Sequence, residues 1–215
     1  MRFHVGPVPD EPDFKPEEEP WSPIREPGPA LFQLLALPIA LVVAFVLAKI
    51  WWSLPISNIR VVIVSAREAL AALAVALAVV GLHELLHALM MPGGWRSDRI
   101  ILGIWPQRLM FYAHYTGAMS RGRFLAVMVT PFLVLSLGPI LLIMGMVAAN
   151  SSISSWVLAV AFAVSLFNGA ASCGDLLGAL LVIVQVPRGA LVRNQGWRTY
   201  WRPRLPEEAI SYAGR

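Results

Sequence analysis

Residues 69–91 read ALAALAVALAVVGLHELLHALMM, an almost entirely apolar run. It is long enough to cross the hydrocarbon core of a bilayer, which takes about 20 mostly apolar residues in a helix. Its only acid, Glu84, stands between His83 and His87 near the end of the segment. An ionisable side chain inside a span costs at least about 2.5–3.5 kcal/mol, so this group indicates a function.

Three other stretches have the same apolar character, and together they dominate the composition. The 215 residues are 57% hydrophobic and 14% charged, with a mean hydropathy of +0.65. An average soluble domain has about 25% charged residues. The candidate spans cover residues 31–54, 69–91, 124–149 and 156–186, the third being interrupted by Pro131 and Pro139. The sequence therefore predicts an all-α membrane protein with four transmembrane helices.

The two ends of the chain differ from the spans. Residues 1–29 are rich in proline and acidic side chains, a composition typical of disordered tails. Residues 188–215 are basic and aromatic, which predicts an interfacial element on the anionic cytoplasmic leaflet. We therefore expect a disordered tail at 1–29, a transmembrane domain that carries the histidines at 30–187, and an interfacial tail at 188–215.

The distribution of Lys and Arg predicts the orientation. These residues concentrate before the first span, between the second and third spans, and after the fourth. The other two connections are nearly bare, with one Arg at 58–60 and none at 150–155. By the positive-inside rule, both termini and the central loop are expected to be cytoplasmic. The net charge of +4 and pI near 9.7 do not indicate nucleic acid, because the arginines lie beside apolar runs.

The central loop between the second and third spans contains two segments rich in β-branched and aromatic residues. They cover 99–105 and 109–115 and flank Pro106 and Gln107, which predicts a β-hairpin. Two roles remain open for it. The hairpin either lies at the membrane interface and packs on the helices, or its edge pairs with an unwound substrate peptide by strand addition.

His83-Glu84-Leu85-Leu86-His87 is an H-E-x-x-H sequence on a segment that must be helical. Positions i and i+4 of a helix share one face, so both imidazoles can bind one metal ion. The adjacent Glu84 is then placed to act as a general base on water activated by the metal, and later to protonate the leaving amine. The ligand types predict zinc.

A catalytic zinc site normally has three protein ligands, so a third residue must come from elsewhere. Asp175 is the candidate in the fourth span, since it lies in the same layer near the cytoplasmic side as the two histidines if the spans are antiparallel. His114, in the central loop, is the alternative third ligand. A site closed by a fourth protein ligand would be structural rather than catalytic.

Asn168, Ser172 and Asp175 form a polar stripe at helical spacing in an otherwise apolar span. Asn168 is predicted to hydrogen-bond the substrate backbone or a developing oxyanion. The alternative is that it serves as a polar contact between helices, which is common in membranes.

These residues also resemble a known family. The resemblance is carried by His83–His87 followed by Pro92-Gly93-Gly94, by Phe111-Tyr-Ala-His-Tyr115 and Met119-Ser-Arg121, and by Asn168-x-x-x-Ser-x-Gly-Asp175. These stretches resemble the putative zincin peptidase family of small bacterial membrane proteins. That family is similar to the site-2 protease clan of intramembrane metalloproteases. The resemblance covers about residues 80–205 and implies a zinc ion held by His83, His87 and Asp175.

The expected function is therefore an intramembrane zinc metalloprotease that hydrolyses peptide bonds of membrane-protein substrates near the cytoplasmic face. Its partners would be the lipid bilayer and a transmembrane peptide substrate, and no nucleic acid. Two alternatives stay open: a zinc-binding membrane scaffold or adaptor without catalysis, and a zinc hydrolase of a lipid-linked substrate. The sequence does not predict the oligomeric state.

Overall fold

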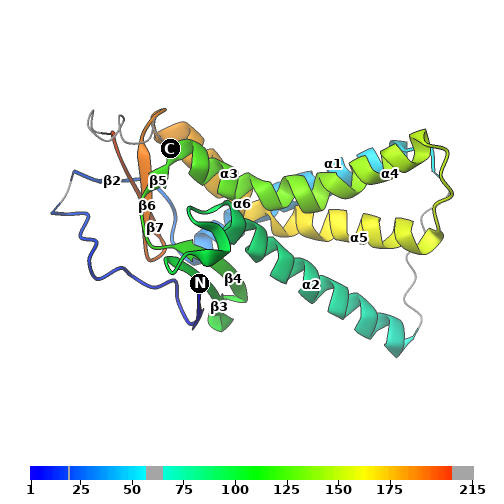
Figure 1. The fold of residues 1–215 in the computed structure, drawn as a ribbon, viewed down its shortest axis with the longest axis horizontal. Coiled ribbons are helices and arrows are strands. Elements are labelled where there is room, and N and C mark those ends of the chain that lie inside the picture. The colour runs from blue at the N-terminus through cyan, green and yellow to red at the C-terminus, as the bar shows by residue number, and fades with distance from the viewer. Residues whose placement is uncertain (19, 57–64, 205–215) are drawn as a thin grey trace. The chain divides into compact units, whose positions relative to one another are not determined.

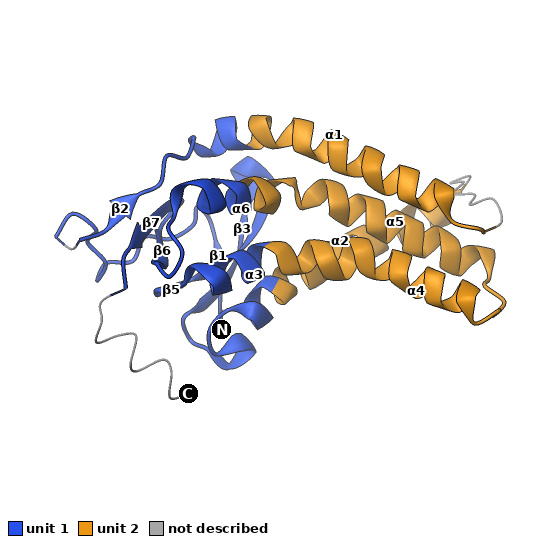
Figure 2. Cartoon of the chain, turned by 90° about the horizontal axis from the view of Figure 1, so that it is seen from above, with its two compact units in different colours: residues 1–32, 87–128, 178–215 blue, residues 33–86, 129–177 orange. Residues whose placement is uncertain are grey.

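The computed structural model describes residues 1–18, 20–56 and 65–204. The chain divides into two compact units (Figure 2). The sheet unit consists of Met1–Phe32, His87–Met128 and Gly178–Arg215, and the helix unit of Gln33–Leu86 and Val129–Leu177. The nearly uncharged connection expected at 58–60 lies outside the described residues.

Three helical runs are long and apolar enough to cross a membrane. A fourth is added if the two helices α5 and α6, which are bent by 47° where they meet, form one span. These runs match the four predicted spans to within about three residues at each end. Their bounds are α1 Pro29–Ser53, α2 Ala66–Met90, α3 Arg121–Pro131 with η3 Phe132–Leu137 and α4 Gly138–Ala148, α5 Ser155–Ala171, and α6 Cys173–Gln185 (Figure 1).

The two prolines of the third run change its hydrogen bonding without ending the helix. Pro139 has no N–H to donate to the preceding turn. The chain responds with a π-helical turn, η3, in which the N–H of Gly138 bonds to the carbonyl of Leu133, five residues back. The run therefore continues from Arg121 to Ala148 and is long and apolar enough to be one membrane span.

The described residues also form two β-sheets, so the prediction of an all-α chain is wrong. The first sheet has the order β1-β3-β4 and contains the predicted hairpin, with β3 and β4 antiparallel. Gly103 on β3 leaves room for the ring of Tyr112, since a Cβ there would lie 2.2 Å from that ring. The bounds are β1 Arg2–Val5, β3 Ile100–Trp105 and β4 Met110–Tyr115, with the turn η2 at Pro106–Arg108.

The second sheet, of order β2-β7-β6-β5, includes much of the C-terminal segment that was expected to lie flat on a membrane. β6 and β7 form an antiparallel hairpin whose turn contains Gly196 at φ +53, a conformation that favours glycine. β-branched and aromatic residues on these strands, such as Val192 and Tyr200, suit a sheet. The bounds are β2 Ser22–Pro23, β5 Met119–Ser120, β6 Leu191–Gln195 and β7 Arg198–Arg202.

The N-terminal segment contains two strands that pair with other parts of the chain. β1 pairs in parallel with β3, and β2 pairs with β7. Between them, Phe14 and Trp21 are buried and pack edge to face at 5.3 Å, and Arg193 lies 4.0 Å from the centre of the Phe14 ring. The composition of residues 1–29 does not indicate this, because the strand partners at 100–105 and 198–202 and the arginine at 193 lie far along the sequence.

Each unit has its own apolar core. In the sheet unit, Ile100, Val127 and Val192 are among the buried residues of a cluster that joins both sheets to the ends of the helices. In the helix unit, Leu47 and Trp51 of α1 pack with Ile143 of α4 and Leu158 of α5. Gly169 on α5 permits this close packing, since a Cβ there would lie 2.3 Å from Cδ1 of Leu47.

Candidate metal centre

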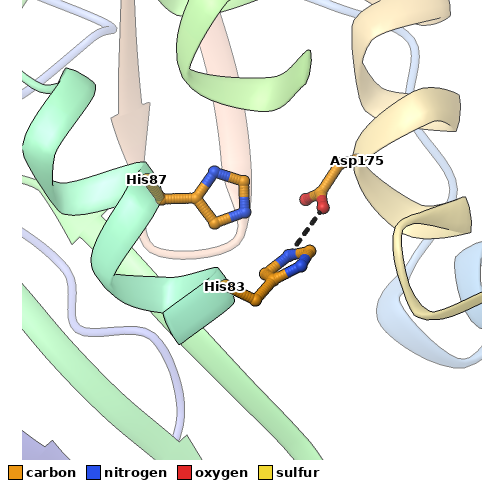
Figure 3. Close-up of side chains that lie close together, drawn as sticks. All are labelled: His83, His87 and Asp175. Atoms are coloured by element: carbon orange, nitrogen blue, oxygen red, sulfur yellow. Dashed lines mark hydrogen bonds and ion pairs between the residues drawn. The ribbon is translucent and has the colours of Figure 1, made fainter. Parts of the chain in front are cut away.

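The H-E-x-x-H sequence lies in the last two turns of α2, so His83 and His87 project from the same face of one helix (Figure 3). One ligand atom each of His83, His87 and Asp175 lies within 4.8 Å of the others. Within the described ranges, these three residues are the one group of metal-binding side chains found together. Both histidines are buried, with 8% and 5% of their surface exposed.

Asp175 comes from the first turn of α6, just after the 47° bend that follows α5. Its Oδ2 atom lies 3.0 Å from Nε2 of His83 (Figure 3). Asp175 was the predicted third ligand, and the structure brings it to the two histidines.

The hydrogen bond of His87 determines which of its ring nitrogens is available to a metal. Nδ1 of His87 lies 2.8 Å from the carbonyl oxygen of Val127. A carbonyl only accepts, so Nδ1 must carry the hydrogen. In the neutral ring, Nε2 therefore has the lone pair that can bind a metal.

His83 is oriented in the same way by Asn168. The amide nitrogen of Asn168 donates to the carbonyl of Pro131 at 3.0 Å, which fixes which end of the amide is oxygen. The amide oxygen then lies 2.8 Å from Nδ1 of His83, so this nitrogen is the donor. Nε2 of the neutral His83 ring therefore presents its lone pair to Asp175.

This arrangement fits zinc. With both Nδ1 atoms donating, Nε2 of neutral His83 and Oδ2 of Asp175 are two acceptors 3.0 Å apart, which repel each other unless a proton or a metal cation lies between them. Two ligands of a tetrahedral zinc at about 2.0–2.1 Å are roughly 3.3 Å apart. Two imidazoles and one carboxylate form a donor set that zinc hydrolases use, and metal-binding histidines typically donate their second N–H to an oxygen.

Glu84, the predicted general base, follows His83 directly on α2, and its side chain is half-buried. Its role in catalysis stays a prediction. For Asn168, the sequence predicts either a contact with substrate or an oxyanion, or a polar contact between helices. The side chain of Asn168 is fully buried, and its amide nitrogen, with two hydrogens, has three protein acceptors within hydrogen-bond distance: the carbonyl of Pro131 and the hydroxyls of Ser136 and Ser172.

Sequence reasoning missed the polar residues that surround Asn168 in the helix unit. Nε1 of Trp51 donates to Oγ of Ser165 at 3.0 Å, and Ser165 donates to the carbonyl of Ser136 at 2.6 Å. All three side chains are buried. The available signal was two serines isolated in apolar spans, where hydroxyls commonly bond between helices.

His114, the alternative third ligand, is not part of the metal-binding group among the described residues. It lies on β4, buried, with Nε2 4.0 Å from Oε1 of Glu11. Burial lowers the pKa of His114 to about 4, so the ring is neutral at pH 7. The structure therefore favours Asp175 over His114 as the third ligand.

A comparison with models of protein families matches residues 76–191 to a family described as "Putative zincin peptidase". The match covers more than half of the chain and includes all three residues of the metal-binding group. Comparisons with curated proteins and with solved structures give no match.

Proposed function

The chain belongs to the putative zincin peptidase family, and from this membership we propose that it is an intramembrane zinc metallopeptidase that cleaves membrane-protein substrates near the cytoplasmic face. The observation that carries the proposal is the convergence of His83, His87 and Asp175 on apolar helices. The hydrogen bonds of both Nδ1 atoms support it further, since they place the lone pair of each neutral ring on Nε2.

The surface of the helices supports a membrane location. Leu41 and Phe45 of α1 and Leu141 of α4 are between 65% and 73% exposed. Helices that are apolar on all sides are either covered by protein or surrounded by lipid. Trp52 and Trp156, at the ends of α1 and α5, are also exposed, as expected of residues at a membrane interface.

The orientation proposed rests on the distribution of basic residues. Arg121 and Arg123 begin α3, and the connection at 150–154 between α4 and α5 has no Lys or Arg. We place the chain termini and the β3–β4 hairpin in the cytoplasm. His87 is one turn from the end of α2 that meets this side, so cleavage would occur close to the cytoplasmic surface.

The chemistry proposed is the hydrolysis of a peptide bond. A zinc ion held by His83, His87 and Asp175 would supply a Lewis acid. Glu84 accepts the proton of the attacking water and delivers it to the nitrogen of the leaving amine. The carboxylate of Asp175 would offset part of the double positive charge of the ion.

The substrate proposed is a transmembrane segment of another protein. A helix in lipid satisfies its own backbone hydrogen bonds, so the segment must unwind before cleavage. An extended peptide could pair with β4, which is an edge strand of its sheet in the order β1-β3-β4.

The test compares cells that express the wild-type chain with cells that express Glu84→Gln. Membrane proteins from both are analysed by mass spectrometry for new N-termini within or next to transmembrane segments. The proposal expects such termini only with the wild-type chain. Equal sets of termini in the two samples would contradict it, and a change confined to lipid-linked compounds would favour a hydrolase of such substrates.

A further inference from the structure

The buried amide of Asn168 supports an inference that rests on the proposed function, because it concerns the same metal centre. We infer that Asn168 is a positioning residue that sets the metal affinity of the site by holding His83 with its hydrogen on Nδ1, and that it is not a ligand of substrate or oxyanion. Asn168, its partners and His83 all belong to the helix unit.

The amide of Asn168 is fixed at both ends. Its nitrogen donates to the carbonyl of Pro131 and to Oγ of Ser136, at 3.0 and 2.8 Å. Turning the amide over would place its oxygen against the Pro131 carbonyl, where two acceptors would face each other. The oxygen is therefore kept 2.8 Å from Nδ1 of His83.

The π-helical turn η3 contributes to the fixed orientation of the Asn168 amide. Ser136 lies in η3 and is fully buried. Its hydroxyl accepts from Asn168, while its carbonyl accepts from Ser165, whose Oγ in turn accepts from Trp51. Turns of this kind are frequent at functional sites. Here the turn supplies the Ser136 hydroxyl that holds Asn168, the residue that orients His83.

The same contacts argue against a direct role in catalysis. An amide nitrogen has two hydrogens, and those of Asn168 are directed at protein acceptors. The side chain is also 0% exposed. An influence on the reaction must therefore pass through His83. Loss of such a partner typically lowers metal affinity about 10- to 100-fold.

The experiment measures metal binding by the full chain in detergent, without any substrate. The zinc dissociation constant is obtained by competition with a chromophoric chelator, and the visible spectrum of the cobalt(II)-loaded protein reports the geometry around the metal. The variants are Asn168→Leu, which removes the acceptor, and Asn168→Asp, which keeps it. Ser165→Ala is the matched control, because Ser165 belongs to the same buried network but does not contact Asn168 or His83 in the hydrogen bonds described.

We expect Asn168→Leu to weaken zinc binding about 10- to 100-fold and to alter the cobalt spectrum. Asn168→Asp should lose less affinity than Asn168→Leu, since it keeps an acceptor for Nδ1 even though its second oxygen faces the Pro131 carbonyl. Ser165→Ala should lower the unfolding temperature of the metal-free protein but leave the dissociation constant unchanged. Equal zinc affinity of wild type and Asn168→Leu would overturn the inference about Asn168 but not the proposed function. The same holds if Asn168→Leu and either of the other variants lose zinc affinity equally. A wild-type chain that binds no zinc would overturn the proposed function as well.

Discussion

In each of the two proposed ligand histidines, the atom that Nδ1 contacts determines which ring nitrogen carries the hydrogen. A backbone carbonyl holds His87, and a side-chain amide holds His83. The difference matters because the carbonyl of Val127 survives a substitution of its side chain, whereas the amide of Asn168 does not. Substitution of the side chain that orients His83 should therefore weaken metal binding more than substitution of Val127, which orients His87 through its backbone.

Glu84→Gln is the residue-scale test of catalysis. The amide is close in size to the carboxylate but cannot accept a proton as a general base, so hydrolysis should fall by about 10²- to 10⁴-fold. Zinc content should be unchanged, because Glu84 is not part of the metal-binding group. The measurement is cleavage of a substrate found with the wild-type chain, and activity above a tenth of wild type would contradict the assigned role.

Among single residues, the sequence predicts as site residues the ionisable side chains that cost free energy inside a membrane span. His83, His87 and Asp175 are such residues, and the structure brings them together. The contacts of Asn168 could not be predicted in the same way. They depend on the carbonyl of Pro131 and on a turn whose hydrogen-bonding register follows from the whole third span.

At the scale of elements, long apolar helices follow directly from composition, whereas the sheets do not. β2 and β5 have two residues each and exist only through pairing with β7 and β6, far along the chain. Local patterns carry little information about such strands. The β3–β4 hairpin was predictable because its two strands are neighbours in sequence.

The contact between α1 and α5 can be tested with two glycines. In Gly169→Ala the new methyl would meet Cδ1 of Leu47, and relief of this overlap should cost about 1–3 kcal/mol. Gly145→Ala is the control, since nothing lies within 4 Å of a Cβ at that position of α4. The control should be neutral or more stable by up to about 1 kcal/mol. Equal unfolding temperatures of the two variants in detergent would show that the packing is not close.

At the scale of the whole molecule, two groups in the sheet unit make stability depend on pH in opposite directions. His114 has a pKa lowered by burial from 6.5 to about 4, so the unfolded chain binds more protons between these values and stability falls as pH decreases. Burial raises the pKa of Glu26 from 4.5 to about 7. The folded chain therefore binds more protons there, and stability falls as pH increases from 4.5 to 7. The two effects oppose each other between about pH 4.5 and 6.5.

Single substitutions should separate these contributions. Glu26→Gln removes the effect of the acid, so this variant should lose stability relative to wild type as pH falls from 6.5 to 4.5. His114→Gln should show the reverse, with stability decreasing relative to wild type as pH rises over the same range. Each slope is at most about 1.4 kcal/mol per pH unit. Unfolding in detergent at several pH values gives both slopes, and slopes of the same sign in the two variants would refute the assignment.

The metal centre can be tested by measuring the zinc content per chain of the protein purified in detergent, for the wild type and for Asp175→Ala and His114→Ala. The proposed site predicts about one zinc ion per chain in the wild type and in His114→Ala, and its loss in Asp175→Ala. A wild-type chain without zinc, or zinc that is retained in Asp175→Ala, would contradict the metal centre and with it the proposed peptidase.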